Sequence, residues 1–319
     1  GKQTSLQMVN HQSPKTKDQT PITRGVRTSV FRHVMMSPTL TPAQMTTRRL
    51  CHKLPAIHLV ILILLVLFWP PLISPHAGPS SFFKKTLKIM TYNIHVGVGM
   101  DKKLDLQRIA DVINQQKPDL VGLQEVDRGV KRTEGKDEIA ELAKMTRMDY
   151  AFAHNLDYQG GQYGVAILSK SLMKNTEHRM FQNKREAERR GMLRVEVQVD
   201  GRVLHFVTTH LDYQYEDGRV FETEQMLNFL DDVKGPLIVV ADLNDEPTGA
   251  AYKLMSSQFV DAWIGSRAKG DGFSYPADKP IKRIDHIFYR SNFFTAKRAK
   301  LIETLASDHV PVVAELELK

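Results

Sequence analysis

The hydrophobic pattern between residue 86 and the C-terminus changes repeatedly between strand-like and helix-like spacing. Short apolar runs bounded by polar or turn-forming residues predict β-strands, and apolar positions three to four residues apart predict helices. Asp200-Gly201, between two alternating runs, predicts a tight hairpin. The predicted strands cover residues 87–94, 119–126, 163–169, 193–199, 203–209, 237–243, 284–289 and 310–318, and the predicted helices cover residues 106–113, 139–143 and 221–233.

This order of elements mixes hairpins with helical crossovers. Such a mixture favours an α/β or α+β sandwich, in which helices cover sheets and strands end in loops that carry polar residues. We find no internal repeat at a fixed period. The pattern therefore predicts one folded domain over residues 86–319.

The residues before this domain have a different composition. Residues 1–54 are polar and end in a basic stretch, which predicts a disordered or non-native leader, with Met45 as a candidate start. An apolar segment, residues 55–73, and a Pro/Ser-rich linker, residues 74–85, follow. This layout is typical of a signal peptide or of an uncleaved transmembrane signal anchor. Both alternatives predict an exported domain, either membrane-anchored outside the cytosol or secreted or periplasmic after cleavage.

The net charge of +8 is unevenly distributed. Residues 1–86 hold 11 of the 44 Lys and Arg residues and one of the 36 acids, so residues 87–319 carry 33 basic against 35 acidic residues. The predicted domain is therefore slightly acidic, which disfavours a generally positive DNA-binding face. The only cysteine, Cys51, precedes the domain, which excludes cysteine-bound zinc and disulfides within it.

Polar side chains able to bind metals or move protons stand at the ends of the predicted strands. Strand ends on one edge of a sheet converge in space, where α/β folds bind their ligands. Carboxylate and amide oxygens suit a hard cation such as Mg²⁺, and a second acid or a histidine can activate water. This inventory favours hydrolysis of a phosphate ester, whose developing charge needs neutralisation. The residues are Asn93, Glu125, His210, Asp242, Asn244, Asp285, Asp308 and His309.

Seven short segments occur in the order TYNIH, LQEVD, GGQYGVAILSK, THLD, VVADLND, RIDHIFY and SDHVPVVAEL. As an ordered set, spanning residues 88–317, they resemble the endonuclease/exonuclease/phosphatase superfamily, which includes deoxyribonucleases, abasic-site endonucleases, sphingomyelinases and inositol polyphosphate phosphatases. The resemblance implies a four-layered α/β/β/α sandwich with the active site at one end of the paired sheets. Val165 departs from the pattern, because similar bacterial proteins often carry Asn there.

The resemblance also implies roles for the strand-end residues. Glu125 is expected to be the principal Mg²⁺ ligand, with Asn93 beside it and Asp308 nearby, and Mn²⁺ is a possible substitute ion. Among similar proteins this metal neutralises charge at the phosphate. The metal site is thus expected at Asn93, Glu125 and Asp308, and the remaining residues are expected to handle water and protons.

Asp242 is expected to align or deprotonate the attacking water, and Asn244 to orient that water and contact phosphate. His309 is expected to bind a phosphate oxygen or act as the base, with its ring oriented by Asp285. The choice between the acid and the histidine as base stays open. His210 is expected to contact the scissile phosphate and support charge on the leaving oxygen.

Several further residues have two interpretations each. Tyr163 and its neighbouring glycines favour a turn, with a substrate-facing loop as the alternative; Arg189-Arg190 could meet phosphate or face solvent; His95 could approach the site or lie on the surface. The remaining histidines of the domain are expected to be structural. The glycines are Gly160, Gly161 and Gly164, and the histidines are His154, His178, His205 and His286.

Three functions compete. The first is a metal-dependent phosphodiesterase acting on nucleic acid or a phospholipid head group, and the second is a phosphomonoesterase acting on a small or lipid-linked phosphate. The third, a non-catalytic binding module, is disfavoured because each expected catalytic position carries a competent residue. The expected partners are a phosphoester substrate and, through residues 55–73 if uncleaved, the membrane; no obligate protein partner is indicated.

Overall fold

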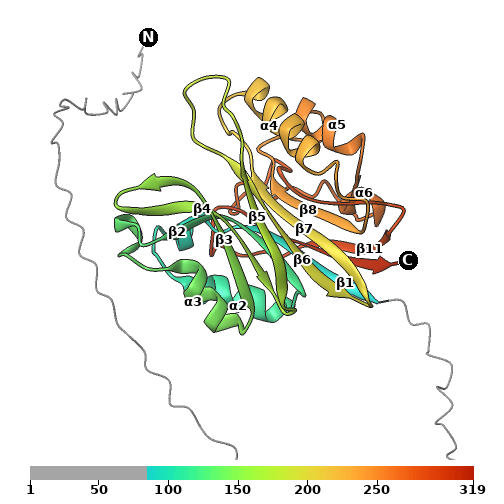
Figure 1. Ribbon diagram of the computed structural model, residues 1–319. Helices are drawn as coiled ribbons and strands as arrows, with labels where there is room; N and C mark the ends of the chain where they lie inside the picture. Colours follow the sequence, from blue (N-terminus) through green and yellow to red (C-terminus); the bar gives the residue numbers. More distant parts are fainter. Residues whose placement is uncertain (1–84) are drawn as a thin grey trace, which may run out of the picture. The chain divides into compact units, whose positions relative to one another are not determined.

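The computed structural model describes residues 85–319, so the predicted leader and apolar segment lie outside the described residues. Two six-stranded sheets pack face to face, and helices cover the outer face of each, which confirms the four-layered α/β/β/α sandwich (Figure 1). Within residues 85–319, no helix is both long and apolar enough to cross a membrane.

The first sheet carries α2 (Leu106–Gln116) and α3 (Glu138–Thr146) on its outer face. Its strands β1 and β2 run parallel, and its other pairs are antiparallel. In spatial order the strands are β11 (Phe294–Leu301), β12 (Val312–Leu318), β1 (Thr86–Asn93), β2 (Leu120–Arg128), β4 (Gly161–Ser169) and β3 (Asp149–Tyr158).

The second sheet carries α4 (Glu216–Phe229) and α5 (Ala250–Ser256) on its outer face, and α6 (Ala262–Gly265) lies at its edge. Here β7 and β8 are the parallel pair. In spatial order the strands are β5 (Met173–Met180), β6 (Gly191–Val199), β7 (Arg202–His210), β8 (Leu237–Asp242), β10 (Asp285–Tyr289) and β9 (Val260–Asp261). The short 3-10 helices η1 (His95–Gly97) and η2 (Lys131–Thr133) complete the described elements.

Three apolar clusters match the four layers. One lies between the sheets, where side chains such as Ile89 and Ile167 face Val195 and Phe206 from the second sheet. The other two lie beneath the helices of each outer layer. Burial of these apolar surfaces is the main force that holds the layers together.

The two sheets approach each other closely at Gly122 of β2. A Cβ atom at this position would lie 2.1 Å from Cγ2 of Val240 and 2.8 Å from Oγ1 of Thr208. Two residues further along β2, Gln124 donates from Nε2 to the same Thr208 hydroxyl at 2.9 Å. Only a residue without a side chain fits at this spacing, so Gly122 sets the separation of the sheets beneath the polar end of the sandwich.

Candidate active site

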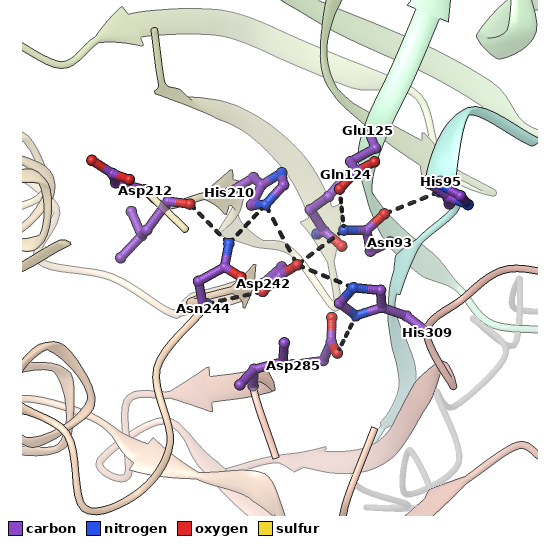
Figure 2. A network of polar contacts seen from close by, with 12 residues as sticks. Asn93, His95, Gln124, Glu125, His210, Asp212, Asp242, Asn244, Asp285 and His309 are labelled. Atoms are coloured by element: carbon purple, nitrogen blue, oxygen red, sulfur yellow. Dashed lines mark hydrogen bonds and ion pairs between the residues drawn. The ribbon is translucent and has the colours of Figure 1, made fainter. Parts of the chain in front are cut away.

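The parallel strand pairs of the two sheets end at the same edge of the sandwich, and the predicted site residues meet there (Figure 2). Asn93 ends β1, His210 ends β7 and Asp242 ends β8, where His210 and Asp242 are register partners. Asp285 begins the antiparallel strand β10 opposite Asp242. The structure thus brings together residues far apart in the chain, such as Asn93 and Asp242, which are separated by 149 positions.

A direct contact between the sheets lies at the centre of the site. The side-chain amide of Asn93 donates to Asp242 Oδ2 at 2.9 Å and to Glu125 Oε1 at 3.0 Å. Glu125 has a backbone φ of +55° where the pairing of β2 with β4 shifts register. A bulge of this kind redirects the side chain that it carries, and strained backbone is common at functional sites.

His309 lies between two carboxylates. Its Nδ1 donates to Asp285 Oδ2 at 2.8 Å, and its Nε2 is 3.7 Å from Asp242 Oδ2. Asp285 Oδ2 also accepts a hydrogen bond from the Ser274 hydroxyl at 2.6 Å. Burial alone would lower the pKa of His309, but Asp285 and then Asp242 outweigh it and raise this pKa to about 10. Near neutral pH His309 is therefore a protonated imidazolium.

Asp242 is almost completely buried, at 1% exposure. Burial first and the neighbouring Asp285 second raise the pKa of Asp242 to about 6. The backbone N–H of Asn244 donates to Asp242 Oδ1 at 2.9 Å, and Asn244 itself has a φ of +50°. Asp242 is thus a carboxylate held in place by several donors, a geometry that suits alignment of a water molecule.

His210 has a different environment. Arg190 donates to its Nδ1 at 2.9 Å, the Asn244 amide lies 2.9 Å from its Nε2, and Asp242 Oδ2 is 3.5 Å from that Nε2. Burial first, and then the charges of Arg190 and His309, lower the pKa of His210 well below its usual value. His210 is therefore neutral, whereas His309 is charged.

Two buried glutamates hold the chain segments that follow Glu125 and His210. Glu138 on α3 accepts a hydrogen bond from the backbone N–H of Asp127 at 2.7 Å, two residues beyond Glu125. In the same way Glu222 on α4 accepts from the backbone N–H of Asp212 at 2.8 Å, two residues beyond His210. Each helix layer thus holds one segment next to the site, the end of β2 or the loop after β7, through a single buried carboxyl group.

The site opens into a pocket of about 900 Å³. Glu125, Asp242, Asn244, Asp308 and His309 line it, whereas Asn93 and Asp285 are buried at 0% and 3% exposure. Four tyrosines and four cationic side chains also contribute to the lining: Tyr158, Tyr163, Tyr213, Tyr275, Arg132, Arg190, Arg219 and Lys282.

Comparison with known proteins agrees with this geometry. The model of the Endonuclease/Exonuclease/phosphatase family matches residues 90–309. The chain belongs to this family. The uncharacterized protein YbhP of Escherichia coli strain K12 is 27% identical over 248 residues, which cover 73% of this chain and 97% of that protein.

Solved structures of the family share the fold. An endonuclease/exonuclease/phosphatase from Beutenbergia cavernae is 22% identical, with a TM-score of 0.61, over 74% of this chain and 72% of that one. The mannosyl-6-phosphatase of Bacteroides thetaiotaomicron is 20% identical, with a TM-score of 0.58, over 72% of this chain and 99% of that one. At these identities the likeness establishes the architecture, not the substrate.

The donor set that the family resemblance predicted for a metal suits a hard cation. Glu125 and Asp308 present carboxylates to the pocket, and Asn93 lies against Glu125. A second group, Asp242, Asp285 and His309, has ligand atoms within 4.8 Å of one another and could also hold an ion. Without an ion, the members of this group are connected by the hydrogen bond from His309 Nδ1 to Asp285 Oδ2 at 2.8 Å, and His309 Nε2 lies 3.7 Å from Asp242 Oδ2.

Several secondary expectations need correction. Arg190 does not face solvent: it is 2% exposed, lines the pocket and donates to His210, whereas the adjacent Arg189 is exposed. Gly161 and Gly164 lie inside β4, where a Cβ on Gly164 would be 1.8 Å from the Ala153 carbonyl oxygen. These two glycines thus serve strand packing rather than a turn or a substrate loop.

Other secondary expectations agree with the structure. Gly160, with a φ of +84°, forms the predicted turn, and the buried Tyr163 lines the pocket. His95 lies at the pocket, with its Nδ1 3.7 Å from Asp308 Oδ1. Val165 faces the core between the sheets and is not among the residues that line the pocket.

Proposed function

We propose that this protein is a metal-dependent phosphodiesterase that cleaves its substrate by in-line attack of water. One observation carries the proposal: the contact of Asn93 with both Glu125 and Asp242 joins a cation-binding half of the site to a water-activating half. Both halves line one open pocket, where a phosphoryl group can meet them together.

The proposed role of each residue follows from the chemistry of its side chain. Glu125, Asn93 and Asp308 would hold Mg²⁺, or Mn²⁺ in its place, and the bound ion would neutralise charge on the phosphate. Asp242 aligns the attacking water and takes its proton, while the charged His309, held by Asp285, donates a hydrogen bond to a phosphate oxygen. This assignment makes Asp242 the base.

The charge of the pocket favours a diester. Three of its four cationic side chains already lie against carboxylates: Arg132 against Asp127, Arg190 against Glu188, and Arg219 against Asp245. The protonated His309 also lines the pocket and likewise lies against a carboxylate, that of Asp285, so few unpaired positive charges remain for a dianionic monoester, whereas a diester carries a single negative charge. The pocket volume of about 900 Å³ also leaves room for a substituent on each side of the phosphorus.

The rim of the pocket favours a substrate with a ring. Tyr158 and Tyr213 are 39% and 56% exposed, and the Arg132 guanidinium lies 4.5 Å from the Tyr158 ring centroid. Aromatic and guanidinium faces stack well on nucleobases and other flat groups. We include in the proposal that the domain acts outside the cytosol, because the predicted signal peptide or anchor over residues 55–73 precedes it.

The test compares ester types with and without EDTA. The purified protein is assayed with Mg²⁺ on bis-p-nitrophenyl phosphate, p-nitrophenyl phosphate, single-stranded DNA and sphingomyelin. EDTA-sensitive cleavage of the diesters supports the proposal, and the natural substrates then separate nuclease from lipid hydrolase activity. Cleavage of the monoester alone makes the protein a phosphatase, in keeping with the name of the Bacteroides thetaiotaomicron neighbour. No EDTA-sensitive cleavage of any substrate refutes the proposal.

A further inference from the structure

Arg190 is a charged residue in a place where charges are rare. Its side chain is 2% exposed and is the most voluminous of the fully buried ones in the described region. It precedes β6 and reaches the floor of the pocket, where one terminal nitrogen lies 2.9 Å from His210 Nδ1 and 3.0 Å from Glu188 Oε1. A buried arginine is retained only when its hydrogen bonds and partners offset the loss of hydration.

The chemistry of arginine determines which ring nitrogen of His210 carries the proton. A guanidinium has donors only and does not lose its proton in proteins, so Nδ1 of His210 must accept. A neutral imidazole then carries its single proton on Nε2, the atom that lies 3.5 Å from Asp242 Oδ2. Asn244 Nδ2, which lies 2.9 Å from Nε2, donates to the Leu211 carbonyl oxygen at 3.0 Å, so the acceptor available to the Nε2 proton is Asp242 Oδ2.

The second histidine of the site has the opposite arrangement. His309 donates from Nδ1 to the carboxylate of Asp285, which stabilises its charged form, whereas His210 accepts at Nδ1 from a cation, which destabilises its charged form. The site therefore holds one charged and one neutral imidazole, both within 4 Å of Asp242.

We propose that Arg190 is a positioning residue that holds His210 as the neutral Nε2–H tautomer. In the proposed hydrolysis, on which this role rests, His210 then acts as a fixed hydrogen-bond donor to the phosphate and does not carry a proton to the leaving group. The departing oxygen takes its proton from another group, such as solvent water. Arg190 is only 2% exposed and contacts His210 through Nδ1, the ring nitrogen on the other side from Asp242, so its proposed role is exerted through His210.

Nitrogen NMR tests the tautomer without any substrate. The full chain labelled with ¹⁵N at histidine gives distinct signals for protonated and unprotonated ring nitrogens, and the variant His210→Gln assigns them by loss. We expect Nδ1 unprotonated and Nε2 protonated, without titration between about pH 6 and about pH 8. A proton on Nδ1, or a charged ring at neutral pH, overturns the inference, even if the protein proves to be an active phosphodiesterase.

Kinetics test the consequence for catalysis. Arg190→Met cannot donate to Nδ1, so it should lower kcat by about 10²-fold, the size expected for loss of one preorganised donor, with KM changed less than about threefold. Because the charge of Arg190 is one of the causes that lower the pKa of His210, the variant should also move the ionisation of His210 to higher pH in the pH profile. Arg190→Gln, whose amide can donate to Nδ1, should recover part of the loss.

The matched control is Arg189→Met, which removes the exposed neighbouring arginine and should stay within about twofold of the parent. Parent values of kcat and an unchanged pH profile in a folded Arg190→Met variant contradict the role of Arg190. If that variant fails to fold, the NMR measurement on the parent decides the question alone. An inactive parent refutes the proposed function but leaves the tautomer measurement intact.

Discussion

Glu138 offers a prediction about stability that needs no substrate. Its carboxyl group is 0% exposed and accepts one hydrogen bond, from the backbone N–H of Asp127. Burial is the largest cause that raises the pKa of Glu138 from its ordinary 4.5 to about 8. We expect the isosteric change Glu138→Gln to remove a pH dependence of stability, because the amide oxygen can accept the same hydrogen bond without a charge.

The sign follows from linkage between protonation and folding. A carboxyl group with a raised pKa binds its proton more tightly in the folded state, so stability is highest below pH 4.5 and falls until about pH 8. A pKa difference of this size corresponds to about 5 kcal/mol in total, of which about 3 kcal/mol falls between about pH 5.5 and about pH 8.5. The parent should lose this amount of unfolding free energy relative to Glu138→Gln.

Urea denaturation at the two pH values, followed by circular dichroism, measures the effect as a difference between parent and variant. This difference cancels the titration of all other groups. Glu141→Gln, a half-buried acid on the same helix, is the control and should keep the parental pH dependence. If the parent and Glu138→Gln lose the same free energy within about 0.5 kcal/mol, Glu138 does not hold its proton in the folded state and the burial argument fails.

Three further predictions concern the site and its second loop. Glu222→Gln should also remove a pH dependence of the unfolding free energy, about 3 kcal/mol in total, which is smaller because burial raises the pKa of Glu222 only to about 7. A pH-dependent loss of unfolding free energy larger than that caused by Glu138 would contradict this order. Asp242→Asn should lower kcat on bis-p-nitrophenyl phosphate by about 10³-fold or more while the melting temperature stays within a few degrees, and activity within tenfold of the parent excludes Asp242 as the base. Glu125→Ala should raise the Mg²⁺ concentration needed for half-maximal activity and be partly rescued by excess Mg²⁺ or Mn²⁺; an unchanged metal dependence rules out its role as ligand.

The central strands of both sheets could be predicted from the sequence because they are apolar on both faces. Strands β3, β5 and β11 were missed for the opposite reason. The sequence of β5, MKNTEHRM, has no apolar alternation, because this edge strand is largely exposed. The start of α4 was placed too late, at residue 221 instead of Glu216, because its first turn is polar and faces solvent. Edge strands and exposed helix ends have too little burial to leave a hydrophobic pattern.

The site residues could be predicted because strand ends carry a distinct combination of acids, amides and histidines in a fixed order. All eight lie around one end of the sandwich, and six of them, including His210, line the pocket directly. Arg190 could not be predicted, because an arginine beside a second arginine is usually exposed, and its burial depends on Glu188 and on a histidine twenty positions away. The buried glutamates on α3 and α4 were missed similarly, since each is one acid among several on an amphipathic helix.

The spacing of the two sheets helps to determine the geometry of the site from outside the pocket. Asn93 and Asp242 arrive from different sheets, so their 2.9 Å contact depends on how far apart the sheets lie, and Gly122 allows that distance. A methyl group on Gly122 would act as a wedge that separates the two halves of the proposed active site without entering the pocket. Substitutions at buried core positions are therefore expected to change the reaction rate without altering the pocket lining. A search for activity variants that is confined to the pocket would miss the positions that determine the distance between the two halves of the site.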